Sequence, residues 1–264
     1  MTWILLTNDD GVESPALVPF ARALSRRWDD VRVVVPDRER SWVAKAITRH
    51  DPVRVTRVSR DGVDVLTATG YPADAVQLGI HSLFDAPPDL IVSGINLGFN
   101  HGAGFLMSSG TVGATVEGWV SGIPGVALST GTVENWAEWR RMANDPASAP
   151  RWDRTARLAA EVVGEVVDSE LLGHCDVANV NLPFDPPRPP RRRITRIARV
   201  GYDRLFREAG DGVYVHDFGG GFLHFETLDG SDIDAAHEGL VSITPLEMPD
   251  AAKIPPEIAR RLER

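Results

Sequence analysis

Short apolar segments alternate with helix-like segments through the first two thirds of this 264-residue chain. Each apolar segment has the length of a strand and is followed by polar residues, Gly or Pro. Strands that alternate with crossover helices form a parallel sheet with helices on both faces. We therefore expect an α/β protein built on such a sheet. The predicted strands are Trp3–Thr7, Val31–Val35, Val63–Ala68, Asp89–Ser93, Gly125–Ser129 and Val177–Asn181.

Apolar residues at helical spacing separate these strands. Ser14 and Pro15 are typical of a helix start, and Leu17, Phe20 and Leu24 would form its apolar face. Pro19 would remove one backbone hydrogen bond from a helix that began at Pro15, so we expect an irregular start. The other predicted helices are one with Pro72 in its first turn, Thr111–Val120, a short one around Glu134–Met142, and Arg154–Leu172.

The pattern changes at Pro183, where the passage PFDPPRPPRRR begins. So many prolines exclude a central strand or helix and are typical of a solvated linker. We therefore predict a core over residues 1–182 and an extension over residues 183–264 that contributes to oligomerisation. The elements predicted for the extension are Ile194–Tyr202, a β-hairpin of Val213–Phe218 and Phe222–Thr227 around Gly219–Gly221, a strand Leu240–Thr244 that returns to the sheet, and a helix over Pro255–Arg264.

Composition limits the classes of function. With 43% hydrophobic and 25% charged residues the chain has the composition of a soluble globular protein, and its formal net charge of −9 argues against a nucleic-acid polymer as a partner. A single cysteine, Cys175, cannot form an intrachain disulfide, which fits a reducing compartment. No apolar run reaches the roughly 18–20 residues of a membrane span. We expect a cytoplasmic protein with no membrane partner.

Polar stretches follow four predicted strands, and the carboxyl ends of parallel strands meet at one edge of a sheet, where ligands bind. Asp9 and Asp10 follow the first strand directly, and Gly11 lets the backbone bend so that both carboxylates approach one point. A hard divalent cation such as Mg²⁺ or Mn²⁺ would offset their repulsion. Alternatively, one aspartate caps the following helix and the other is solvated. The four stretches are Asn8–Gly11, Asp37–Ser41, Thr69–Gly70 and Ser93–Asn100.

Two of the other stretches add oxygen and nitrogen groups. Ser41 could supply a hydroxyl ligand, and Arg38, Arg40 and Lys45 are either available to an anion or part of a solvated loop.

The passage SGINLGFNHGAGFLMSSGTVGATVEG contains Asn96 and Asn100, whose amides could bind a cation or a phosphate. The residues Ser108–Thr111 lie at the start of a predicted helix, where free N–H groups and a partial positive charge suit a phosphate. A flexible loop is the alternative, and the passage lacks the Gly-Lys-Ser/Thr of a Walker motif.

These residues resemble the SurE family of metal-dependent 5′/3′-nucleotidases (survival protein SurE, acid phosphatase-like). The matching blocks span Ile4 to about Leu246 in the family's order. They are ILLTNDDGVESPAL, VVVPDRERSWVAKAIT, TATGYPADAV, DLIVSGINLGFNHG, SSGTVGATVEG and GLVSITPL.

The resemblance implies a Rossmann-like core and an extension that exchanges between subunits in homodimers or homotetramers. It implies hydrolysis of nucleoside monophosphates to nucleoside and phosphate, with one divalent cation held by Asp9, Asp10, Ser41 and Asn96. The chain departs from the family at Ser108, where an aromatic residue or His is common, and at Trp42 and Lys45, where the family has small residues and often a His. We expect these departures to affect substrate preference.

We therefore predict a phosphomonoesterase that acts on nucleoside 5′-monophosphates, with 3′-monophosphates as a second class. Asn100, Ser109, Gly110 and Thr111 would hold the phosphate. Asp9 or Asp10 would either attack phosphorus or act as base towards a water.

His101 is a candidate proton donor to the leaving alcohol, or else a surface-loop histidine. The rival functions are a nucleotide-dependent transferase that holds a metal–diphosphate and a nucleotide-binding module without catalysis.

Overall fold

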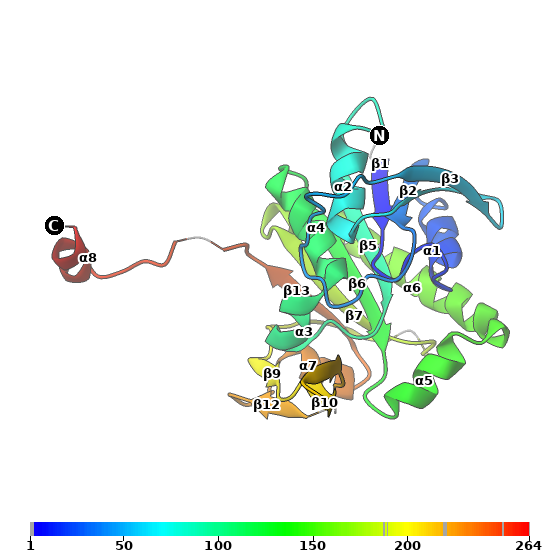
Figure 1. Ribbon diagram of the computed structural model, residues 1–264. Helices are drawn as coiled ribbons and strands as arrows, with labels where there is room; N and C mark the ends of the chain where they lie inside the picture. The colour runs from blue at the N-terminus through cyan, green and yellow to red at the C-terminus, as the bar shows by residue number, and fades with distance from the viewer. Residues whose placement is uncertain (1–2, 187, 189, 219–220, 250, 264) are drawn as a thin grey trace.

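The computed structural model describes residues 3–186, 188, 190–218, 221–249 and 251–263 of the chain. Its centre is a nine-stranded sheet of strand order β3-β4-β2-β1-β5-β6-β7-β13-β8 (Figure 1). The strands of this sheet are β1 (Trp3–Thr7), β2 (Asp30–Pro36), β3 (Val55–Arg60), β4 (Val63–Ala68), β5 (Leu90–Leu97), β6 (Gly125–Gly131), β7 (Val177–Pro183), β8 (Arg192–Ile194) and β13 (Val241–Leu246).

The six inner strands β4, β2, β1, β5, β6 and β7 pair in parallel, each with its neighbour. Antiparallel strands flank them, β3 beside β4 and β13 beside β7. The mostly parallel sheet and the α/β class predicted from the sequence are confirmed. All five residues of β1 are buried, because helices cover both faces of a parallel sheet.

Helices form a layer on each face of the sheet (Figure 1). On one face, α1 (Leu17–Leu24) and α6 (Ala149–Asp168) share a buried apolar core that includes Phe20 and Trp152. On the other face, α2 (Pro72–His81) and α4 (Gly110–Val120) bury residues such as Val76 and Ala114. The remaining helices are α3 (Gly102–Ser108), α5 (Trp136–Ala143), α7 (Asp232–His237), α8 (Pro256–Leu262) and the short 3₁₀ turns Pro146–Ser148 and Leu171–Gly173.

The first helix starts later than the sequence predicts. It begins at Leu17 rather than Pro15, and the hydroxyl of Ser14 accepts a 3.4 Å hydrogen bond from the N–H of Ala16 instead of capping the helix. Pro19 therefore lies in the first turn, where its missing N–H has no helical acceptor to lose. The irregular start is confirmed, and its cause is this shift.

The predicted β-hairpin extension is confirmed, but the predicted pairing of Val213–Phe218 with Phe222–Thr227 is wrong. The strand β11 (Val213–His216) pairs with β10 (Phe206–Gly210), and β12 (Phe222–His224) pairs with β9 (Val200–Tyr202). The reversal between β10 and β11 uses left-handed residues, with φ of 101° at Gly210, 51° at Asp211 and 76° at Gly212. Gly219 and Gly220 lie outside the described residues.

The end of the chain returns to the sheet and then leaves it. The strand β13 pairs antiparallel with β7, with Ser242 opposite Asn181, so the predicted return strand is confirmed. The Arg-rich end of the predicted linker forms the edge strand β8. The terminal helix α8 lies far from the sheet at the end of an extended segment (Figure 1). The predicted division at residue 182 stays a prediction.

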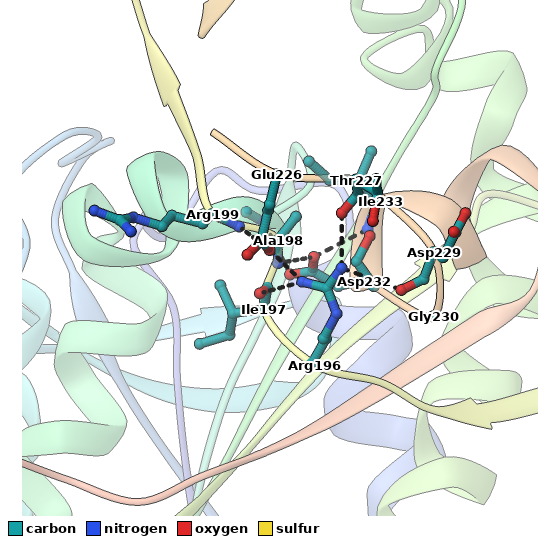
Figure 2. A network of polar contacts seen from close by, with 12 residues as sticks. Arg196, Ile197, Ala198, Arg199, Glu226, Thr227, Asp229, Gly230, Asp232 and Ile233 are labelled. Atoms are coloured by element: carbon teal, nitrogen blue, oxygen red, sulfur yellow. Dashed lines mark hydrogen bonds and ion pairs between the residues drawn. The ribbon is translucent and has the colours of Figure 1, made fainter. Parts of the chain in front are cut away.

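A polar network holds the extension together, as Figure 2 shows. The guanidinium of Arg196 donates to the carbonyl oxygens of Thr227 at 2.7 Å and Asp229 at 3.1 Å, and it pairs with Glu226. The carboxylate of Asp232 accepts a 3.0 Å hydrogen bond from the N–H of Ala198. These contacts join the segment before β9 to the segment that follows β12.

The strand order changes direction at one point of the sheet, between β1 and β5. From β1 the chain proceeds to β2 on one side, whereas from β5 it proceeds to β6 on the other side. In open α/β sheets, ligands bind outside the carboxyl ends of the strands at such a switch point. Within the described residues, no helix is both long and apolar enough to cross a bilayer.

Candidate functional site

Asp9 and Asp10 lie at the carboxyl end of β1, at the switch point. Asn8 holds their turn, because its side chain accepts a 3.0 Å hydrogen bond from the N–H of Gly11 and donates one of 3.0 Å to the carbonyl of Gly11. Gly11 has a φ of 82°, and an added Cβ would lie 2.5 Å from the carbonyl carbon of Arg38. Only glycine fits there, so the local sequence Asn-Asp-Asp-Gly builds the turn that presents both carboxylates.

Asp9 faces the first turn of α4. The hydroxyl of Thr111 donates a 2.7 Å hydrogen bond to its Oδ1 atom. A Cβ added at Gly110 would lie 2.9 Å from the Cβ of Asp9 and 3.0 Å from its Oδ2. The positive end of the α4 dipole is therefore in direct contact with this carboxylate, which is only 4% exposed.

Asp10 joins β1 to β5. Its Oδ2 accepts a 3.0 Å hydrogen bond from the N–H of Leu97. Burial raises the pKa of Asp9 to about 6, and burial together with the charge of Asp9 raises the pKa of Asp10 well above its ordinary value. Asp9 is buried and Asp10 is half-buried. Two such adjacent carboxylates repel each other when both are ionised, so a cation between them would lower the free energy of the ionised pair.

Ser41 and Asn96 lie on the two segments that flank this pair. The N–H of Arg40, one residue before Ser41, donates a 2.7 Å hydrogen bond to the carbonyl of Asp9. The amide nitrogen of Asn96 donates a 2.7 Å hydrogen bond to the carbonyl of Gly98, which leaves the amide oxygen of Asn96 for another partner. The structure thus brings together the three segments that carry the four predicted metal ligands.

The donor set of these four residues fits a hard divalent cation. It consists of two carboxylates, one hydroxyl and one amide oxygen, and such cations prefer oxygen ligands. Over the part of the chain that is described, no group of three or more His, Cys, Asp and Glu side chains could hold a metal ion. A cation at Asp9 and Asp10 would therefore also use neutral oxygen ligands.

Glu39 and Arg140 border the site, and neither was predicted from the sequence. Glu39 accepts a 2.7 Å hydrogen bond from the hydroxyl of Ser41, and its carboxylate oxygens lie 3.1 and 3.0 Å from a guanidinium nitrogen of Arg140. The charge of Glu39 raises the pKa of Asp9 and Asp10, whereas that of Arg140 lowers the pKa of Asp10. The two residues are 101 positions apart, and no local pattern relates them.

The start of α4 has the geometry of an anion site. The hydroxyl of Ser109 caps the helix by accepting a 3.1 Å hydrogen bond from the N–H of Val112, and the N–H of Gly113 bonds the Ser109 carbonyl. The N–H groups of Gly110 and Thr111 belong to the first turn, where a helix offers no internal acceptor. The N–H of Thr111 already serves Asp9, whose pKa a backbone hydrogen bond from Thr111 lowers, so the N–H of Gly110 is the one that could bind a phosphate oxygen.

Asn100 connects the glycine-rich loop to the sheet. Its amide nitrogen donates to the Ser129 hydroxyl at 2.8 Å and to the Thr111 hydroxyl at 3.4 Å. Its backbone is held by Asn181, whose Oδ1 accepts from the Asn100 N–H at 2.8 Å, and by Asn179, which donates 2.8 Å to the carbonyl. A signal for this role exists in the sequence, since the core strand β7 carries two asparagines two residues apart, on one face.

The basic residues considered for an anion are largely engaged elsewhere. Lys45 forms a 2.5 Å ion pair with Glu117, which is 3% exposed on α4 and needs a countercharge. The guanidinium of Arg40 donates a 2.8 Å hydrogen bond to the carbonyl of Thr69 and lies over the ring of Tyr71. Arg38 is exposed. Lys45 is therefore engaged by Glu117 rather than available to an anion in this structure.

His101 is buried, so its interpretation as a surface-loop histidine is wrong. Its ring lies 5.0 Å from that of Phe99. Burial lowers the pKa of His101, and the charge of Asp232 partly opposes this effect. Asp232 also accepts a 2.8 Å hydrogen bond from the N–H of Gly102, so the extension holds the loop next to His101.

Known proteins resemble this chain over nearly its whole length. Residues 4–204 match the family model described as Survival protein SurE. The chain is 37% identical over 248 residues to the 5′-nucleotidase SurE of Geotalea uraniireducens, which covers 93% of this chain and 92% of that protein. It is 32% identical over 247 residues to the 5′-nucleotidase SurE of Methanococcoides burtonii, covering 93% of each. The crystal structure of the SurE protein from Aquifex aeolicus matches with a TM-score of 0.74 at 28% identity, over 99% of both chains.

Proposed function

This chain belongs to the survival protein SurE family, and we propose that it hydrolyses nucleoside 5′-monophosphates to nucleoside and phosphate with one divalent cation, Mg²⁺ or Mn²⁺. It is a 5′-nucleotidase, as its relatives are named. The observation that carries the metal-dependent mechanism is the position of Asp9. This buried carboxylate lies beside a second one, Asp10, and against the N-terminus of α4.

Asp9, Asp10, Ser41 and Asn96 would hold the cation through their oxygen atoms. Such a cation, when bound, offsets the charge of the phosphate and makes a water more acidic. The N–H of Gly110 at the start of α4 would bind a phosphate oxygen, and Thr111 orients Asp9 through its hydrogen bond. Asp9 or Asp10 would either accept a proton from the attacking water or attack phosphorus itself.

We extend the proposal to nucleoside 3′-monophosphates as a second substrate class. The start of α4 is formed by Ser109, Gly110 and Thr111, with Asn100 beside it. The groups that these residues offer to a ligand suit a phosphate. A site that recognises the phosphate would accept either ester position. The sugar and the base would then decide the preference.

Phosphate release from AMP, 3′-AMP and ribose 5-phosphate, measured with Mn²⁺, with Mg²⁺ and with EDTA, tests the proposal. We expect turnover with either cation and loss of turnover in EDTA that added Mn²⁺ restores. Asp9→Asn and Asp10→Asn should each lower kcat/KM by at least a hundredfold, because each removes a charged ligand. Glu208→Ala, an exposed carboxylate of the extension, is the matched control. Turnover that is indifferent to EDTA and to both substitutions would contradict the metal-dependent mechanism.

We also propose that the extension joins subunits into a homodimer or homotetramer. Its strands expose large apolar side chains, and α8 has no buried residue within this chain. Apolar groups of this kind are commonly covered by another subunit. The exposed residues include Phe206, Tyr214, Phe222, Phe225, Ile258 and Leu262.

Light scattering on the full chain and on a chain truncated after Met248 tests this assembly. We expect a dimer or tetramer that the truncation converts towards monomer. A full chain that is monomeric at micromolar concentration would contradict the proposal.

We further propose that the enzyme acts in the cytoplasm on small phosphomonoesters rather than on nucleic-acid polymers or membranes. The net charge of −9 and the single cysteine support this. Cell fractionation of the source organism would test the compartment.

A further inference from the structure

Trp42, the residue after Ser41, lies among aromatic rings beside the candidate site. Its ring centroid is 5.0 Å from that of His216, 5.4 Å from Tyr202 and 5.6 Å from Phe105. The rings come from the loop after β2, from α3 and from the extension. Three parts of the chain that are far apart in sequence therefore meet at one indole.

The backbone of Trp42 adopts a conformation that is costly for a bulky residue. Its φ is 61°, in the left-handed region where glycine is at ease and a tryptophan is not. Strain of this kind persists where neighbouring structure holds it, and it is often found at ligand sites. The side chain is nevertheless 38% exposed, so the strained position does not serve to bury the indole completely.

The rings around Trp42 leave its flat face without a parallel partner. The four described rings that contact it meet it at interplanar angles of 55° to 68°. None of these contacts is a parallel stack on the indole. Because Trp42 is 38% exposed, part of its ring is accessible for a planar ligand to stack on.

This aromatic group adjoins the segment that starts α4. The N–H of Ala44 donates a 3.0 Å hydrogen bond to the carbonyl of Ser108, and a Cβ added at Gly113 would lie 2.2 Å from the carbonyl oxygen of Ala44. The hydroxyls of Ser108 and Tyr202 are 2.9 Å apart and share a hydrogen bond. Trp42 is thus tied to the same segment that carries the proposed phosphate groups of α4.

We propose that Trp42 stacks on the nucleobase of the substrate, with Tyr202 and His216 supporting the indole, and that it makes the enzyme prefer purine nucleotides. This inference rests on the proposed function, because it places the phosphate at α4. Ser41 and Trp42 are adjacent, about 3.8 Å apart between Cα atoms, so a single nucleotide can reach both the cation ligands and the indole. Stacking recognises any base but favours the larger ring system of a purine.

Trp136, the first residue of α5, is the rival platform near the site. It is 42% exposed, and its ring lies 3.1 Å from the position of a Cβ added at Gly98. However, Trp139 stacks on it at 5.1 Å with an interplanar angle of 30°, which covers one of its faces. Trp42 has no parallel stacking partner among the described rings, which favours the first position, and Trp136→Ala supplies a matched control.

Trp42→Gly is the main test, because glycine adopts a φ of 61° without strain and the backbone should be kept. The assays compare AMP with ribose 5-phosphate, which has the same phosphate and sugar but no base. We expect KM for AMP to rise roughly 5- to 150-fold, the range for loss of one base–aromatic stack, with kcat nearly unchanged. KM for ribose 5-phosphate should stay constant, and Trp42→Phe should retain most of the affinity for AMP.

Calorimetric titration with adenosine gives a second readout that requires no turnover. Adenosine binding should weaken in Trp42→Gly and persist in Trp136→Ala. Equal changes of KM for AMP and ribose 5-phosphate, or a base-selective loss in Trp136→Ala instead, would overturn the inference. If the wild type hydrolyses neither substrate, the proposed function fails, and adenosine binding still decides the role of Trp42.

Discussion

The hydroxyl of Thr111 donates a 2.7 Å hydrogen bond to Oδ1 of Asp9, across 102 positions of sequence. The bond fixes the rotation of a buried carboxylate that we propose as a metal ligand. Thr111→Val keeps the shape of the side chain and removes the donor. Loss of such a supporting hydrogen bond typically weakens metal binding about 10- to 100-fold, and we expect a fall of this size in Mn²⁺ affinity by calorimetric titration.

Thr115→Val is the matched control for that experiment. Thr115 is also buried in α4, but its hydroxyl donates to the carbonyl of Val112 within the helix. The control should change thermal stability without changing Mn²⁺ affinity. Equal losses of affinity in the two variants would contradict the role of Thr111.

Gly110→Ala should disable the site by steric contact. The new methyl group would lie 2.9 Å from the Cβ of Asp9, 3.0 Å from its Oδ2 and 3.2 Å from the carbonyl oxygen of Arg40. The backbones of Asp9 and Arg40 cannot move away freely from the new methyl group. Overpacking of this kind costs about 1–3 kcal/mol. We expect Mn²⁺ affinity and kcat/KM to fall at least tenfold. Gly173→Ala has no atom within 4 Å of the new methyl group and should behave as wild type.

The raised pKa of Asp9 predicts a pH-dependent stability in the absence of metal. Folding raises this pKa from 3.8 to about 6, so the folded protein holds the proton more tightly than the unfolded chain does. The folded state therefore loses stability from this group as the pH rises from about 4 to about 6, and the loss is complete above that range. Asp9→Asn removes the penalty, because its side chain stays neutral.

Calorimetric Tm values in EDTA test this at pH 4.5 and pH 7.5. The Tm of Asp9→Asn minus that of the wild type should be more positive at pH 7.5 than at pH 4.5. Saturating Mn²⁺ should reverse the order at pH 7.5, because only the wild type keeps both charged ligands. A difference in Tm that is the same at both pH values in EDTA would exclude a raised pKa at Asp9.

Asp232 should be a main determinant of the extension's stability. Its buried carboxylate accepts backbone hydrogen bonds from Gly102 at 2.8 Å, Ala198 at 3.0 Å and Ile233 at 2.9 Å (Figure 2 shows the last two donors). Asp232→Ala leaves these donors unsatisfied, at a cost of at least about 2 kcal/mol. At this chain length we expect Tm to fall by roughly 4–8 °C.

Glu208→Ala, an exposed carboxylate of the same extension, should leave Tm nearly unchanged. Asp232→Asn keeps an acceptor oxygen and should lie between the two. An Asp232→Ala protein with wild-type Tm would show that these hydrogen bonds contribute nothing to folding.

The local sequence alone determined the positions of some strands. The strands Trp3–Thr7 and Val63–Ala68 have the predicted bounds, because a short apolar run that ends in polar or Gly residues identifies a buried strand without reference to the rest of the chain. The carboxylates of Asp9 and Asp10 could be placed for a similar reason. They follow a strand directly, and strand ends of a parallel sheet converge.

Tertiary structure decided every feature that depends on contacts between distant segments. The hairpin partner of β11 was mispredicted because β10, with the sequence FREAG, was not predicted as a strand. Only the left-handed turn at Asp211 and the packing of β12 on β9 select the observed pairing. The contact of Glu39 with Arg140 spans 101 positions. That of Asp232 with Gly102 spans 130. Residue types and spacing carry the chemistry of a site, but the neighbours that set its charge and geometry come from the fold, because they meet only when the sheet and its helices are assembled.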